Sequence, residues 1–169
     1  IKTSGLKEYG LEKELLSERL VRAVEERKEE EKELGVVAAL NNADTTGVLL
    51  EVLLADPKKV MDGIAIAAYA LGTEKKALYL PKYAADKEAA VKEAAEQAGV
   101  ELIVGLVNVR ACKGSALIHI VTAANLADTF AGSYEKLFRD VTNKAIHLQH
   151  FEGKRVALYG PSSYRWIVN

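Results

Sequence analysis

The chain has 169 residues, of which 49% are hydrophobic and 28% charged, and its formal net charge is −1. This length and composition predict one globular domain with a hydrophobic core. A net charge near zero argues against a dedicated nucleic-acid-binding protein, which needs an excess of cationic side chains to neutralise phosphates.

Cysteine content and apolar run length set two further limits. The single cysteine, Cys112, can form neither an internal disulfide nor the ligand set of an iron–sulfur cluster, so a reducing, cytoplasmic location is expected. The longest apolar stretch, Ile64 to Leu71, is far shorter than the roughly 20 residues of a membrane span. We therefore expect no membrane span. His147 and His150 fall on a predicted strand, where their odd spacing sends the two imidazoles to opposite faces, so no metal site is expected either.

The first 34 residues are predicted to form a long amphipathic helix that packs on the rest of the chain. Apolar residues recur at helical spacing between Leu6 and Leu34, namely Leu15, Leu16, Leu20 and Val24. The charged run from Glu25 to Glu33 is expected to be a solvated face of this helix. The predicted division is a helix over 1–34 and a single α/β domain over 35–169.

From Val36 onward, short apolar runs alternate with helical patterns. Strands are predicted at 36–40, 76–80, 101–109 and 116–121, and helices at 58–71, 87–98 and 123–138. Asp56 and Asp86 are predicted N-caps, Pro57 fits a first helical turn, and Gly72 and Gly99 fit helix ends. Two later strands, at 145–151 and 155–159, are expected to form a hairpin.

This alternation predicts parallel strands joined by right-handed crossovers. The predicted fold class is therefore α/β: a three-layer domain with a mainly parallel sheet, preceded by a long amphipathic helix. A ligand of such a sheet is expected at the carboxyl ends of its strands. Four polar or rigid residues fall near that rim, namely Asn42, Asp44, Pro81 and Asn108.

Several segments between Val36 and Phe130 resemble one known family. The best match runs from Asp56 to Gly72, where an Asp-Pro helix start is followed by an acidic residue and a glycine, then by small apolar residues and Tyr-Ala. Asn42-Ala43-Asp44 precedes this helix as in the family, and two further segments match, Lys76–Leu80 and Ile120–Thr129. Together they resemble the FMN- and NADH-binding flavoprotein subunit of NADH:quinone oxidoreductases.

The resemblance implies a Rossmann-like, FMN-binding domain, with NADH as a second ligand and with iron–sulfur or other redox subunits as partners. Asn42 and Asp44 would then hydrogen-bond the flavin, and Thr122 falls in a segment near the family's second flavin-contacting loop. The predicted cofactor-binding residues are therefore Asn42, Asp44 and Thr122. No catalytic residue is assigned, because the hydride chemistry would be the cofactor's own.

The chain also departs from the family pattern. The family has a Gly-rich loop ahead of its first strand, where clustered backbone N–H groups meet the flavin phosphate, but the run from Glu25 to Glu33 contains no glycine. Thr45 replaces a glutamate, Val121 and Thr122 replace paired asparagines, and the Gly-Glu-Glu stretch that helps to bind the nicotinamide cofactor is missing.

Alternatives therefore stay open. The chain is either an oxidoreductase component or a non-catalytic binding or assembly module that keeps the fold without the flavin site. A third hypothesis is a homo-oligomeric scaffold assembled through the N-terminal helix. An Asx turn at a strand end would account for Asn42 and Asp44 equally well.

Overall fold

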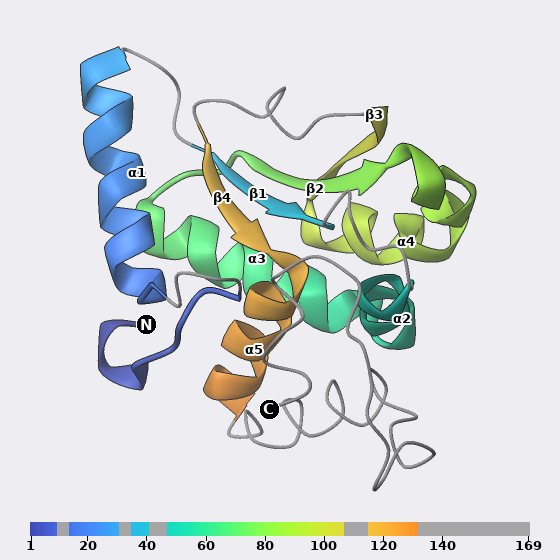
Figure 1. Cartoon of the computed structure of the whole chain (residues 1–169), viewed down its shortest axis with the longest axis horizontal. Helices are drawn as coiled ribbons and strands as arrows, with labels where there is room; N and C mark the ends of the chain where they lie inside the picture. The colour runs from blue at the N-terminus through green and yellow to red at the C-terminus, as the bar shows by residue number, and fades with distance from the viewer. Residues whose placement is uncertain (10–13, 31–34, 41–46, 107–114, 132–169) are drawn as a thin grey trace, which may run out of the picture.

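A sheet of four parallel strands forms the centre of this computed structural model, which describes residues 1–9, 14–30, 35–40, 47–106 and 115–131 (Figure 1). The strands are β1 (Val36–Ala39), β2 (Lys76–Pro81), β3 (Glu101–Leu106) and β4 (Ala116–His119). Their order across the sheet is β3-β2-β1-β4, and every adjacent pair is parallel. The predicted parallel sheet is confirmed.

The two central strands are apolar along almost their whole length. All four residues of β1 are buried, as is every residue of β2 after Lys76. Strands of a parallel sheet that are buried on both faces show continuous apolar runs rather than alternation. The edge strand β4 instead alternates between buried and half-buried residues.

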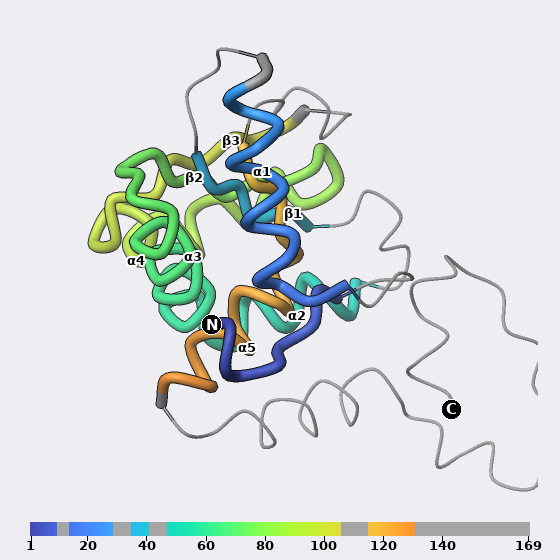
Figure 2. The backbone as a smooth tube through the Cα atoms, turned by 90° about the vertical axis from the view of Figure 1, so that its left-hand side faces the viewer, coloured from blue at the N-terminus to red at the C-terminus, as the bar shows by residue number. Residues whose placement is uncertain are grey.

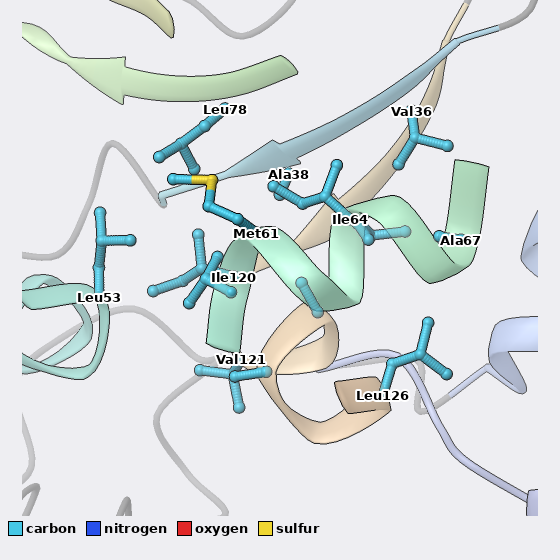
Figure 3. Packing of buried hydrophobic residues seen from close by; sticks show 14 of the residues in the cluster. Val36, Ala38, Leu53, Met61, Ile64, Ala67, Leu78, Ile120, Val121 and Leu126 are labelled. Atoms are coloured by element: carbon cyan, nitrogen blue, oxygen red, sulfur yellow. The ribbon is translucent and has the colours of Figure 1, made fainter. Parts of the chain in front are cut away.

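Five α-helices lie within the described residues, together with the 3-10 helices η1 (Lys2–Ser4) and η2 (Lys82–Lys87). The α-helices are α1 (Leu16–Glu30), α2 (Val48–Ala55), α3 (Pro57–Leu71), α4 (Glu88–Ala98) and α5 (Ile120–Ala131). Helices α3, α4 and α5 pack on one face of the sheet, where Met61 and Ile64 of α3 point toward Leu78 and Ala38 (Figure 3). None of the helices in this part of the chain is both long and apolar enough to cross a membrane.

The opposite face of the sheet is also buried. Its apolar cluster contains a fully buried tyrosine, Tyr79, together with Val37, Ala39 and Ala77. Since both faces are covered, the sheet is the middle of three layers, and the predicted fold class is confirmed.

Helix α3 begins and ends as predicted. The Asp56 side chain accepts a hydrogen bond from the Lys59 N–H at 3.0 Å, and Pro57 occupies the first turn. Gly72 ends the helix with φ of 66°, a left-handed conformation that glycine adopts without strain. Gly99 ends α4 in the same way.

The N-terminal helix is shorter than predicted. It begins at Leu16 rather than Leu6, and the Leu16 N–H donates to the Leu6 carbonyl at 2.9 Å. Lys7 pairs with Leu15 in an antiparallel bridge, and Leu6 is only 4% exposed in the main core. These tertiary contacts hold the first residues outside any α-helix and override the helical spacing. A helix ahead of the sheet is nevertheless present, and Leu16 and Leu20 pack it on the core.

The structure differs from the predictions at three other places. Helix α2 was not predicted, because its continuous apolar run lacks a helical period. Asp86 does not cap α4; it lies in η2, where its carboxylate pairs with Lys87 at 2.7 Å. Strand β4 stops at His119, so residues 120–121 are helical rather than extended. The predicted hairpin at 145–151 and 155–159 and the predicted helix beyond residue 131 lie outside the described residues.

Candidate functional site

The carboxyl edge of the sheet contains a topological switch point between β1 and β4. The chain leaves β1 through α2 and α3 toward β2, whereas the connection after β3 returns to the other side of β1 to form β4. In open parallel sheets, ligands bind in the crevice where strand order reverses in this way. This edge is therefore the candidate ligand site of the domain.

The structure describes only some of the residues that the sequence predicts at this edge. Strand β1 leads into the buried Leu40, whose N–H donates to the Tyr79 carbonyl at 3.3 Å. Asn42 and Asp44 follow within four residues in sequence, but they lie outside the described residues, as does Asn108. Pro81 ends β2 at the same edge of the sheet.

Thr122, the third predicted cofactor-binding residue, is described and fully buried in the first turn of α5. Its Oγ1 accepts a hydrogen bond from the Tyr9 backbone N–H at 2.8 Å. The structure therefore brings Thr122 together with the N-terminal segment, 113 residues away in sequence.

A polar cluster that the sequence analysis did not identify surrounds this contact. Glu8 Oε1 accepts a hydrogen bond from the His119 N–H at 2.7 Å, and the Tyr9 ring lies on the His119 ring with centroids 4.3 Å apart. The His119 Nδ1 in turn accepts from the Val121 N–H at 3.1 Å. The cluster thus joins the N-terminal segment to the end of β4 and the start of α5.

Burial sets the protonation of the two ionisable groups in this cluster. Desolvation raises the pKa of Glu8 to about 7, against the opposing effects of the His119 N–H, the Arg19 charge and the Thr122 hydroxyl. Desolvation also lowers the pKa of His119 to about 3. The imidazole is neutral, because a ring nitrogen that accepts a hydrogen bond has no proton of its own.

The cluster lies at the outer edge of β4, not in the crevice beside β1. The Ala116 N–H donates to the Gly35 carbonyl, toward β1, so the backbone groups of Leu117 and His119 point away from it. The Leu117 carbonyl accepts a hydrogen bond from Arg19 of α1, and the His119 N–H is taken by Glu8. These two side chains therefore satisfy backbone groups that an edge strand would otherwise leave unpaired.

Helices α3 and α5 are held close together below the sheet. A Cβ atom on Gly63 would lie 1.7 Å from the Ala123 carbonyl oxygen, so the two backbones are in direct contact. The Lys59 Nζ also lies 3.1 Å from Asp128 Oδ1, and the Asp128 side chain is 3% exposed. The sheet edge is therefore supported by a rigid pair of helices.

No protein-family model matches the chain, and no curated protein matches it in sequence. Among the residues that the structure describes, no group of three or more His, Cys, Asp or Glu side chains could hold a metal ion. His147, His150 and Cys112 lie outside those residues.

Proposed function

We propose that this domain binds FMN at the carboxyl edge of its parallel sheet and acts as the flavin-binding component of an NADH-linked oxidoreductase. The observation that carries the proposal is the switch point between β1 and β4, with Asn42 and Asp44 following β1 directly in sequence. An amide and a carboxylate that follow β1 in sequence would supply donors and acceptors for the polar edge of a flavin.

Two further features bear on this proposal. The Asp56-capped helix α3 packs tightly against α5 through Gly63, which gives the sheet edge the rigidity that a cofactor site requires. The single cysteine means that an iron–sulfur cluster would have to come from a partner subunit. In this proposal NADH reduces the flavin, and the flavin passes electrons to that partner.

A second candidate function is a non-catalytic binding or assembly module with the same fold. Two observations favour it. The Thr122 hydroxyl is engaged by the Tyr9 amide, and the stretch ahead of β1 lacks the glycines that would bring several N–H groups to a phosphate.

FMN titration separates the two candidates. We expect saturable quenching of FMN fluorescence with a Kd in the micromolar range, about −8 kcal/mol of binding free energy. The double variant Asn42→Ala/Asp44→Ala should weaken binding by about tenfold or more. Asp86→Ala, which removes an exposed carboxylate from η2, is the matched control and should bind as the unmodified protein does.

Addition of NADH to the FMN-loaded protein without oxygen tests the redox step. Loss of the oxidised-flavin absorbance is the expected result. Absence of FMN binding at millimolar concentrations would leave the non-catalytic module as the function of this domain.

A further inference from the structure

The segment Leu6–Tyr9, here called the strap, closes the outer edge of β4. It runs between α1 and α5 (Figures 1 and 2). Backbone hydrogen bonds tie it to the start of α1, since the Glu8 N–H donates to the Glu14 carbonyl at 2.7 Å. Leu6 anchors one end in the core, and the Tyr9 N–H anchors the other on Thr122.

The contacts of the closed strap favour two neutral side chains. The His119 Nδ1 accepts the Val121 N–H, which a doubly protonated imidazolium could not do. The Glu8 Oε2 is buried without a hydrogen-bond partner within the described residues, so an ionised carboxylate would be poorly solvated there. Closure is therefore most favourable with Glu8 protonated and His119 uncharged.

The charged groups around Glu8 do not reverse this preference. Arg19 of α1 stabilises the carboxylate form of Glu8, whereas Glu14 opposes it. Arg19 and Glu14 lie 3.5 Å apart, and Arg22 pairs with the same Glu14 oxygen at 2.7 Å, so part of the Arg19 charge is already balanced. From α5, Thr122 contributes a neutral hydroxyl.

We propose that the strap is a proton-coupled latch, in which closing transfers one proton from the His119 imidazolium to the Glu8 carboxylate, which leaves both side chains neutral, and opening returns it. The open strap exposes both side chains to water, where at mildly acidic pH Glu8 is an ionised carboxylate and His119 a protonated imidazolium. The latch is independent of flavin binding and depends only on the contacts between the strap, β4 and α5.

The two groups have opposite effects on closure as pH changes. The pKa of Glu8 rises from 4.5 to about 7 on closing, so its contribution is present below 4.5 and is lost as pH rises through 7. The pKa of His119 falls from 6.5 to about 3, so its contribution is present above 6.5 and is lost as pH falls. Between 4.5 and 6.5 the open and closed states hold the same number of protons, and closure is therefore nearly independent of pH.

Amide hydrogen exchange followed by NMR tests the latch, because the Tyr9 and His119 amides are both covered by the closed strap. The opening constant is the exchange rate divided by the intrinsic rate at each pH. In the unmodified protein it should change by less than about threefold between about pH 8 and about pH 5. Glu8→Gln keeps an acceptor oxygen but cannot titrate. In this variant the opening constant should rise roughly thirtyfold from about pH 8 to about pH 5.

In His119→Asn the opening constant should instead fall, by up to roughly eightyfold from about pH 8 to about pH 5, because only Glu8 then titrates. The Asn side chain can still accept the Val121 N–H, as His119 Nδ1 does. Glu25→Gln, which removes an exposed carboxylate from α1, is the matched control and should keep the nearly pH-independent opening constant. The proposal would be overturned by an opening constant that depends steeply on pH in the unmodified protein. It would also be overturned by an opening constant that does not depend on pH in either Glu8→Gln or His119→Asn. Unchanged exchange of buried α3 amides shows that each variant is folded.

Discussion

Gly63 is the residue at which α3 and α5 make backbone contact. Replacing a helical glycine with alanine ordinarily stabilises a helix by about 0.5–1 kcal/mol. Here the new methyl group would lie 1.7 Å from the Ala123 carbonyl oxygen, and neither backbone can move without separating the two helices. We expect Gly63→Ala to lower the free energy of unfolding by about 3 kcal/mol or more, measured by urea denaturation.

Ala70→Ser is the control for this substitution. Ala70 lies in the same helix but is exposed, so the change should alter stability by no more than about 0.5 kcal/mol. If Gly63→Ala were as stable as Ala70→Ser, the two helices could not be in backbone contact at Gly63.

The candidate site shows which residue contacts a sequence can predict. The Asp56 cap was predictable, because the side chain and the amide that it accepts from are three residues apart. The contact between Glu8 and His119 joins residues 111 positions apart, and neither residue belongs to a local motif. Thr122 was predicted to contact a cofactor, but only the fold reveals that its hydroxyl accepts the Tyr9 amide.

Among the elements, α1 protects the open edge of the sheet. Arg19 reaches from α1 to the Leu117 carbonyl, which points away from β1 and would otherwise depend on water. Exposed edges of this kind also promote pairing between molecules. We expect Arg19→Ala to destabilise the protein by about 1–2 kcal/mol in urea denaturation and to accelerate hydrogen exchange in β4.

Arg22→Ala provides the comparison, since Arg22 lies on the same helix and pairs with the same Glu14 carboxylate rather than with a strand carbonyl. Its side chain is 46% exposed, against 27% for Arg19, and a surface ion pair contributes at most about 1 kcal/mol. Equal losses for the two variants would mean that Arg19 acts through Glu14 rather than through the strand edge.

Element boundaries were predictable where a local signal existed. Gly72 and Gly99 end their helices as expected, since a left-handed residue there needs glycine. The junction at residues 119–120 had no such signal, because an apolar run reads equally well as a buried strand or a buried helix. The start of α1 was misplaced because Leu6 fits the helical spacing yet packs in the core from the strap.

At the scale of the whole molecule, the fold class follows from the alternation of strands and helices, because parallel strands need crossover helices to connect them. The order of the strands across the sheet does not follow from this alternation. The return of the chain from β3 to the far side of β1 creates the switch point, and no residue pattern between these strands specifies it. The parallel sheet and its carboxyl edge were therefore predictable from the sequence, whereas the position of the switch point along that edge was not.

The three-layer arrangement makes a direct prediction about two tyrosines. Tyr79 lies on the sheet face opposite α3 and is fully buried, whereas Tyr69 on α3 is 90% exposed. Truncating a buried aromatic side chain leaves a cavity and costs on the order of 3–5 kcal/mol, while an exposed one changes stability by about 0.5 kcal/mol or less. We expect Tyr79→Ala to show the large loss in urea denaturation and Tyr69→Ala to show almost none. A sheet with one face open to water would make both substitutions mild, so similar midpoints for the two variants would contradict a covered second face.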